Sequence, residues 1–401
     1  MEYFFHIVTP QFYPVVGGSE KSVERIAILL KSIFNDSESA IYVLDTSNPN
    51  DNYSVSDIKI NYLRDKKDFV LAPLIAIDGD FLNIITNKKN SNRHIFKIDY
   101  FTLKSEIESC INYYPEHKHI IVSFYITNSG YVAQHVANNL NISHITSIRG
   151  SDFSLNFYNP NYYQSYDFVL KSVDYIVTTS KEQENALLKV FPAISSKIST
   201  VYNSIQNIHQ LPLWKNSKRD RIKIVCDTGF SLKKGTHILL ESIANLFNSG
   251  YKISFEIAGA IEDHEFKYWQ SIITEFESKY SYFKYHNYIR EIRNFIYDGD
   301  IYCSATLGEG CSNARIFSFC IGIPMVTTSV GEMAHLGKNS ENVILVPPIE
   351  PNLFTNSLLT LIDRIQSDKM QIDSSIILAR RNQFTENTEK YAWKNIIEKL
   401  F

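Results

Sequence analysis

Residues 309–326 join a carboxylate to the start of a predicted helix. Their sequence is EGCSNARIFSFCIGIPMV, in which Glu309 and Gly310 open an apolar, helix-like run that stops at Gly322 and Pro324. A loop that enters a helix presents free backbone N–H groups, which suit a phosphate, and a nearby carboxylate suits sugar hydroxyls. The segment therefore predicts a nucleotide-sugar site. The plainer alternative is that Glu309 only stabilises the helix dipole, by a few tenths of a kcal/mol.

Two glycine-containing loops lead from predicted strands into predicted helices. In PVVGGSEKSVER, Gly17 and Gly18 permit a tight turn with exposed amides, which favours an anion at the helix N-terminus. In CDTGFSLKKGTHILL, Lys234 precedes Gly235 just before an amphipathic helix, where its charge could offset that of a leaving diphosphate. Each has a plainer alternative: a simple strand-to-helix connection for the glycine pair, and a solvated side chain for the lysine.

Charged residues at other turns are weaker candidates. Arg149 and Asp152, in IRGSDF, follow a predicted strand and are expected to face a cleft, with a local ion pair as the alternative. The Asp-Gly-Asp triplets 78–80 and 298–300 hold paired carboxylates of the kind that bind divalent metals, but we interpret both as turns, since Asp300 opens a strand. The histidines show no metal spacing, and no Ser/His/Asp or Cys/His arrangement stands out, so we predict no metal site.

The composition excludes several classes of protein. The chain has 401 residues, enough for two domains, and a formal charge of −3, which argues against a nucleic-acid-binding protein. Its five cysteines are scattered without ligand spacing, which indicates reduced thiols. The N-terminal sequence MEYFFHIVTPQFYP lacks the features of a signal peptide, and no run reaches the roughly 18–20 apolar residues of a membrane span. We therefore expect a cytoplasmic protein.

Short apolar runs alternate with helical patterns along the chain. This alternation predicts two Rossmann-like α/β domains that face a cleft, each with a parallel sheet covered by helices. Ligands of such sheets bind at the carboxyl ends of the strands, so the loops described above are expected to meet there. The predicted strands are 3–9, 120–124, 143–148, 175–179, 222–226, 253–258, 300–304, 325–328 and 343–346, and the clearest predicted helices start near residue 19 and span 236–249 and 391–401.

A polar segment after Asn203 divides the sequence. We expect a first Rossmann-like domain over residues 1–205, a linker over 206–220 and a second Rossmann-like domain over 221–385. The remaining residues, 386–401, contain the last predicted helix, which could pack back on the first domain.

Five segments, in order along almost the whole chain, resemble the family 4 glycosyltransferases (glycosyl transferases group 1), which are retaining enzymes of GT-B architecture. The segments are PVVGGSEKSVERIA, IRGSDF, DYIVTTSKEQENAL with KISTVYNSI, LKKGTHILLESIANL and EGCSNARIFSFCIGIPMVTTSVGE. The resemblance implies metal-independent, cofactor-free transfer of a hexosyl or related sugar from a nucleotide-diphosphate donor to a hydroxyl acceptor. It also implies an acceptor-side first domain, a donor-binding second domain, and a glycan or glycolipid acceptor in bacterial surface polysaccharide or glycoconjugate synthesis. Peripheral contact with the inner face of a membrane and the oligomeric state stay open.

The resemblance further implies roles for the residues that match the family's motifs. Lys234 would bind the diphosphate and Glu309 the sugar hydroxyls, as catalytic residues. Arg149 and Asp152 would lie on the acceptor side or in the cleft. The donor-binding residues would be Gly17, Gly18, Lys233, Gly310, Cys311, Ser312, Asn313 and Phe317.

Three positions depart from the family's pattern. The second Glu of the donor helix, which hydrogen-bonds the ribose in the family, is Phe317 here, and loss of one such bond would weaken donor affinity about tenfold. The family often has an Arg shortly before the Lys-Gly pair, whereas residues 229–231 read GFS, and Lys233 could act there as a point charge. Arg149 stands where many members have a His.

These departures keep two other functions in view. A non-catalytic GT-B-like partner subunit is motivated by Phe317 and the missing Arg. A nucleotide-sugar epimerase on a similar scaffold has no distinctive residue in its support. An active glycosyltransferase is the leading hypothesis, because Lys234 and Glu309 match the family's motif.

Overall fold

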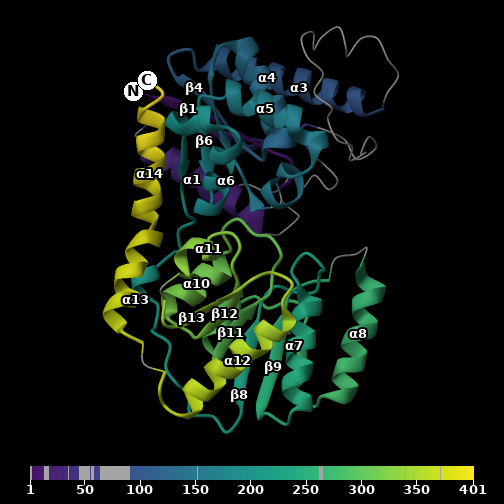
Figure 1. Ribbon diagram of the computed structural model, residues 1–401. Coiled ribbons are helices and arrows are strands. Elements are labelled where there is room, and N and C mark those ends of the chain that lie inside the picture. Colours follow the sequence, from purple (N-terminus) through teal and green to yellow (C-terminus); the bar gives the residue numbers. More distant parts are fainter. Residues whose placement is uncertain are drawn as a thin grey trace. The chain divides into compact units, whose positions relative to one another are not determined.

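The chain folds into two compact α/β units, each built on one parallel sheet (Figure 1). The first unit comprises residues 1–203 and 389–401, and the second comprises residues 204–388. This computed structural model describes residues 2–12, 18–34, 36–44, 55, 58–63, 91–150, 152–261, 265–338, 340–370 and 372–401. Both sheets confirm the predicted pair of Rossmann-like folds.

The sheet of the first unit has seven strands in the order β3-β2-β1-β4-β5-β6-β7, and all neighbours run parallel. Strand β1 pairs with two neighbours, so that Ile7 lies opposite Ile41 of β2 on one side and Val122 of β4 on the other. The strands are β1 (Tyr3–Thr9), β2 (Glu38–Val43), β3 (Lys59–Tyr62), β4 (Lys118–Phe124), β5 (Ser143–Ser147), β6 (Tyr175–Thr178) and β7 (Ile198–Thr200). The helices are α1 (Gly18–Ile33), α3 (Ser91–Tyr113), α4 (Tyr131–Leu140), α5 (Tyr163–Ser172) and α6 (Lys181–Val190).

The last helix of the chain, α14 (Glu386–Glu398), contributes to the core of the first unit. Trp393 is fully buried and belongs to the same apolar cluster as Phe5 of β1 and Val23 of α1. An ion pair between Arg25 of α1 and Glu389 of α14 adds a polar contact. Residues almost 400 positions apart in the sequence therefore share one core, because the apolar face of α14 is buried there.

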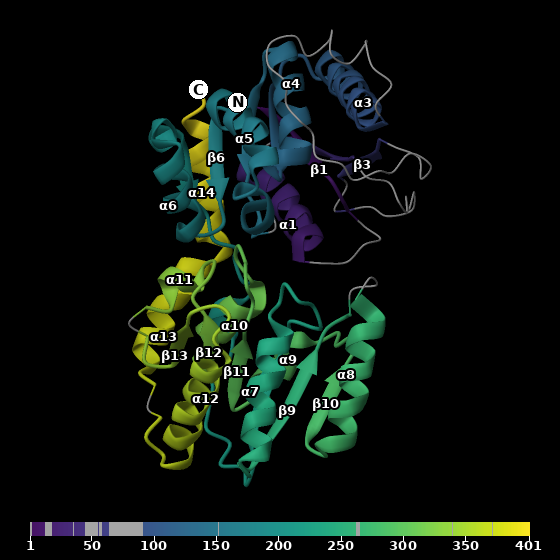
Figure 2. The ribbon, with the colours of Figure 1, turned by 45° about the vertical axis from the view of Figure 1, so that its right-hand side comes forward.

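The sheet of the second unit has six parallel strands in the order β10-β9-β8-β11-β12-β13. Helices α7, α8 and α12 cover one of its faces, and α9 and α10 cover the other (Figure 2). The strands are β8 (Ile222–Cys226), β9 (Ile253–Ala258), β10 (Phe283–His286), β11 (Ile301–Ser304), β12 (Met325–Thr328) and β13 (Val343–Val346). The helices are α7 (Thr236–Asn248), α8 (Phe266–Lys279), α9 (Ile292–Tyr297), α10 (Asn313–Ile321), α11 (Met333–Leu336), α12 (Pro351–Gln366) and α13 (Ser374–Arg381).

All nine predicted strands are present, with ends that differ by at most two residues. The helices predicted from near residue 19, over 236–249 and over 391–401 are also present, the last of them beginning earlier, at Glu386. Strands β2, β3, β7 and β10 were not predicted from the sequence. Of these, β3, β7 and β10 lie at sheet edges, and each has at most one buried residue, so they lack a sustained apolar run.

The segment expected to be a linker, residues 206–220, packs on the second unit. The backbone N–H of Trp214 donates to the carbonyl of Ile321 at 2.7 Å, and its indole Nε1 donates to the carbonyl of Gly299 at 3.2 Å. Arg381, which is 1% exposed, donates to the carbonyls of Leu211 and Pro212. Hydrogen bonds between backbone carbonyls and the buried side chains of Trp214 and Arg381 therefore hold the segment within the second unit.

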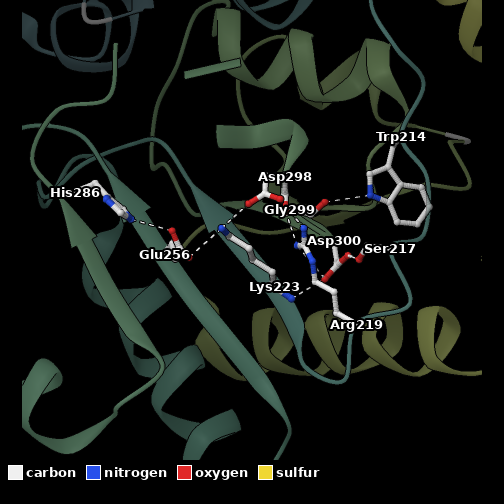
Figure 3. A network of polar contacts seen from close by, with 9 residues as sticks. All are labelled: Trp214, Ser217, Arg219, Lys223, Glu256, His286, Asp298, Gly299 and Asp300. Carbon is white, nitrogen blue, oxygen red and sulfur yellow. Dashed lines mark hydrogen bonds and ion pairs between the residues drawn. The ribbon is translucent and has the colours of Figure 1, made fainter. Parts of the chain in front are cut away.

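A polar network holds the Asp-Gly-Asp triplet 298–300 in place (Figure 3). Asp300 is 1% exposed and accepts a hydrogen bond from the backbone N–H of Lys223 at 2.8 Å. Nζ of Lys223 lies 2.8 Å from Asp298 and 2.9 Å from Glu256, whose other oxygen lies 2.9 Å from Nε2 of His286. These carboxylates therefore have partners within the protein, in agreement with the interpretation of the triplet as a turn. The other triplet, 78–80, lies outside the described residues.

Among the described helices, none has the length and apolar character needed to cross a membrane.

Candidate active site

Three neighbouring strands of the second sheet, β8, β11 and β12, end at one edge, and their loops form the candidate site. The loops span residues 227–235, 305–312 and 329–332. Because the strands are parallel, their carboxyl ends meet at the same edge of the sheet, which is where open α/β sheets bind ligands. Two of these loops contain the predicted catalytic residues.

The loops after β8 and β11 touch backbone to backbone. Gly235 has a φ of 65°, and a Cβ at this position would clash with the carbonyl oxygen of Ala305. Only glycine therefore allows this approach. The N–H of Leu307 donates to the carbonyl of Lys233 at 3.0 Å. These contacts fix the loop that carries Lys234 against the loop that carries Glu309.

Lys234 and Glu309 form an ion pair, with 2.7 Å between Nζ and Oε2. Their side chains are 32% and 20% exposed, so the pair remains partly open to solvent. Burial by itself lowers the pKa of Lys234, but the Glu309 carboxylate outweighs burial and raises that pKa. Burial raises the pKa of Glu309, and Lys234 together with Arg315 outweighs it and lowers that pKa. Both side chains are therefore held in their charged forms.

A second acid, Asp227, stands directly after β8 and was not singled out from the sequence. Oη of Tyr302 donates a hydrogen bond to Oδ1 of Asp227 at 2.6 Å. Burial raises the pKa of Asp227, against the opposing effects of the Tyr302 hydroxyl and the Lys234 charge. Asp152 was selected from the sequence because it is an acid that follows a buried strand. Asp227 follows β8 in the same way, so the same criterion could have identified it.

The predicted donor-binding residues after Glu309 lie at the start of α10. Ser312 caps the helix, since its Oγ accepts a hydrogen bond from the backbone N–H of Arg315 at 3.4 Å. The N–H of Gly310 points to Oε1 of Glu309 at 3.4 Å, Cys311 is half-buried, and Asn313 is exposed. A capped helix N-terminus beside a carboxylate and a lysine can hold an anion and a polyol together.

Phe317 is buried in the second unit, where α10 packs against α9. Its side chain is 3% exposed, and the guanidinium of Arg293 lies 5.8 Å from the ring centroid. The ring therefore fills an apolar position of the helix. The region before the Lys-Gly pair likewise holds an aromatic ring, because Phe230 is fully buried and packs edge-on against Trp269.

A buried ion pair next to the Glu309 loop was also not predicted from the sequence. Nε of Arg315 lies 3.2 Å from Oε1 of Glu332, and the two side chains are 1% and 0% exposed. Arg315 is the one charged residue within the apolar run 313–321. That isolated charge was a usable signal, but its partner stands in a different loop.

The remaining predicted site residues belong to the first unit. Gly18 is exposed at the start of α1, and Gly17 lies outside the described residues. Arg149 is 7% exposed, with its guanidinium 4.4 Å from the ring centroid of Phe124. Asp152 is fully buried and accepts a hydrogen bond from the backbone N–H of Ile126 at 2.6 Å. The structure thus brings Lys233, Lys234 and the segment 309–313 together in the second unit. Gly18, Arg149 and Asp152 lie in the first unit.

Residues 221–364 match the family model described as Glycosyl transferases group 1. The second unit carries a glycosyl transferases group 1 domain. The match includes both the Lys-Gly loop and the Glu309 loop, and it confirms the resemblance for this part of the chain. Membership of family 4 in particular stays a prediction. No curated protein matches the sequence.

Solved structures confirm the GT-B fold over the full chain. Sucrose-phosphate synthase from Thermosynechococcus elongatus superimposes with a TM-score of 0.73 at 12% identity, covering 100% of this chain and 99% of that one. A glycosyltransferase from Rickettsia africae gives 0.70 at 15% identity, covering 100% and 98%. The Anabaena protein HepE in complex with UDP gives 0.68 at 12% identity, covering 98% and 99%. The glycosyltransferase domain therefore sits in a chain with the whole GT-B architecture.

Proposed function

We propose that this protein is a retaining glycosyltransferase that moves a sugar from a nucleotide-diphosphate donor to a hydroxyl acceptor. The observation that carries the proposal is the Lys234–Glu309 pair of 2.7 Å, partly exposed at the carboxyl edge of the second sheet. The group 1 match over 221–364 and the GT-B fold support it. A hexosyl or related sugar and a glycan or glycolipid acceptor, in bacterial surface polysaccharide or glycoconjugate synthesis, belong to the same proposal. So do a cytoplasmic location and independence of metal ions.

The proposed chemistry needs charge stabilisation more than a protein nucleophile. The bond between the anomeric carbon and the diphosphate breaks, the acceptor oxygen bonds to that carbon, and the acceptor proton passes to the leaving diphosphate. Lys234 stabilises the negative charge that develops on the diphosphate, and Glu309 orients the sugar through its hydroxyls. Because Glu309 already holds Lys234, the lysine is positioned before a donor arrives.

A panel of nucleotide sugars tests this function. Release of nucleoside diphosphate would be followed with and without glycan and glycolipid acceptors, and UDP-glucose comes first, because a HepE structure contains it. We expect turnover with at least one donor, and its loss in Glu309→Gln. Glu275→Gln, which removes an exposed carboxylate from α8, is the matched control. Absence of both turnover and any donor-induced rise in melting temperature would contradict the proposal.

A non-catalytic partner subunit is the second candidate, because buried Phe317 replaces the carboxylate that holds the ribose in family 4. The same panel separates the two functions. A subunit of this kind would show no turnover with any donor, even where a nucleoside diphosphate raises its melting temperature.

A further inference from the structure

The buried pair of Arg315 and Glu332 connects two loops of the candidate site. Nη2 of Arg315 donates to the carbonyls of Thr328 at 3.2 Å and Val330 at 2.8 Å, which are in β12 and the turn after it. Nε of the same side chain lies 3.2 Å from Oε1 of Glu332. Arg315 itself is the third residue of α10, only six positions after Glu309. The side chain therefore links the start of α10 to the turn 329–332.

The same turn touches the Glu309 loop directly. The N–H of Glu332 donates to the carbonyl of Gly310 at 3.0 Å. Gly331 has a φ of 64°, and a Cβ there would come within 2.9 Å of the carbonyl oxygens of Glu309 and Gly310. The backbone that carries Glu309 thus rests on the turn that Arg315 holds. Any change in the Arg315–Glu332 contact would shift this support.

The charge of Arg315 acts on the candidate site as well as on Glu332. Burial raises the pKa of Glu332 to about 7, although the Arg315 charge opposes that rise. The same guanidinium adds to the effect of Lys234 in lowering the pKa of Glu309, and it opposes the rise in the pKa of Lys234. Nη1 of Arg315 is buried without a hydrogen-bond partner among the described residues, whereas the Glu332 carboxylate also interacts with the backbone N–H groups of Ser312 and of Glu332 itself. The positive charge is thus incompletely matched by its partner.

Stability alone is a poor reason for such a pair. Removing two charges from water carries a desolvation penalty, and apolar replacement of a buried pair is often neutral or stabilising. Here the hydrogen bonding is also incomplete, so the penalty is only partly offset. A buried positive charge beside an anion site, in contrast, strengthens binding, because the surrounding dielectric is low.

We propose that Arg315 is a positioning residue of the donor site, which holds the Glu309 loop on the turn 329–332 and whose positive charge favours binding of the donor's diphosphate. This inference rests on the proposed function. Arg315 thus brings a buried positive charge that acts on Lys234 from a different element, α10.

The test measures protein stability and diphosphate affinity in a double-mutant cycle that removes the two charges singly and together. The variants are Arg315→Met, Glu332→Gln, the double variant and Arg315→Lys. For each variant, the affinities for UDP, GDP and ADP would be measured. The affinity for the nucleoside that corresponds to the tightest-binding diphosphate would be measured as well, together with the melting temperature. Steady-state kcat and KM would be recorded with the matching nucleotide sugar. The nucleoside carries no phosphate, so it reports structural damage without the charge effect.

We expect Arg315→Met to weaken diphosphate binding about tenfold or more, as for a lost charge-assisted interaction, with little change for the nucleoside. Glu332→Gln keeps the positive charge and should bind the diphosphate at least as tightly as the wild type. The double variant should regain melting temperature relative to Arg315→Met and still bind the diphosphate weakly. Arg315→Lys should retain most of the affinity and show a lower kcat, since its ammonium cannot reproduce the several contacts of the guanidinium.

Two results would overturn the inference. One is a double variant that binds the diphosphate as the wild type does. The other is an equal loss of diphosphate affinity in Arg315→Met and Glu332→Gln that is proportional to the fall in their melting temperatures. In both cases the wild type still binds the diphosphate, so neither result counts against the proposed function. If the wild type binds none of the three diphosphates, the proposed function fails as well.

Discussion

Nζ of Lys234 lies 2.7 Å from Oε2 of Glu309, although the two residues are 75 positions apart in the sequence. Each comes from a loop after a parallel strand, and the glycine that follows Lys234 allows the two loops to touch. Each side chain also holds the other in its charged form. The pair combines a cation for a diphosphate with a carboxylate for hydroxyls, and it is the basis of the first prediction.

Lys234→Met should lower kcat roughly 100-fold to 1,000-fold, because it removes the cation that stabilises the leaving diphosphate. The melting temperature should change little, since the pair is partly exposed and contributes about 1 kcal/mol or less. The measurement is the initial rate of nucleoside diphosphate release at saturating donor. Lys252→Met, at an exposed lysine of the same unit, is the matched control. Rates within a factor of about two of the control would contradict this role.

Phe317→Glu should tighten binding of the nucleotide donor about tenfold, through a new hydrogen bond to the ribose. Arg293 lies beside this position and would offset the added charge. The variant should also be less stable, because the side chain at 317 is 3% exposed and a carboxylate there loses hydration.

Calorimetric titration with the preferred nucleoside diphosphate, well below both melting temperatures, measures the effect of Phe317→Glu. Phe317→Gln is the control, since a glutamine side chain has nearly the same shape as a glutamate side chain and carries no charge. An affinity of Phe317→Glu equal to or below that of Phe317→Gln would show that position 317 does not reach the ribose.

Asp300→Ala should destabilise the second unit by about 1–3 kcal/mol and leave donor affinity unchanged. The substitution leaves the N–H of Lys223 without its acceptor in a buried place (Figure 3). Asp300 precedes β11, whereas the candidate site follows β11, so the change lies at the opposite end of the strand.

Urea denaturation and titration with a nucleoside diphosphate measure the two effects of Asp300→Ala separately. Asp298→Ala is the control, because its side chain is 55% exposed and its ion pairs should contribute less than about 1 kcal/mol. A weakened donor affinity in folded Asp300→Ala would connect this network to the site, against our expectation.

The first unit should lose stability as the pH falls below about 6.5, the ordinary pKa of histidine. Burial lowers the pKa of His144 to about 3 and that of His135 to about 4. The unfolded chain therefore binds these protons first, so the free energy of unfolding decreases with falling pH by about 1.4 kcal/mol per pH unit for each group.

Urea denaturation of the wild type and of His144→Gln between pH 7.5 and 5 measures this dependence. His144 accepts or donates hydrogen bonds with Gln134 at 2.7 Å and Ser123 at 2.8 Å, and a glutamine preserves polarity at the site without titrating. The variant should be less stable at pH 7.5 and show a shallower decline toward pH 5. An unchanged slope would mean that His144 does not titrate on unfolding.

Local sequence patterns were sufficient to predict most of the second unit. Strands such as 222–226 and 253–258 are short apolar runs bounded by turn residues, and their limits agree with the structure. The edge strands β3, β7 and β10 were missed, because polar residues interrupt their short runs, whereas the edge strand β13 reads VILV and was predicted. Helix α14 was expected, and its burial in the first unit depends on contacts with strands at the other end of the chain.

The sequence by itself determined the types and order of the site residues: Lys234 before a glycine and a helix, and Glu309 before another helix. These are local properties, set by neighbours along the chain. Only the tertiary structure decided that their side chains meet and that Arg315 and Glu332 pair beneath them. It also decided that Phe317 is buried against α9. Such contacts depend on strand order and on which face of a helix is covered, and both are set by packing between segments far apart in sequence.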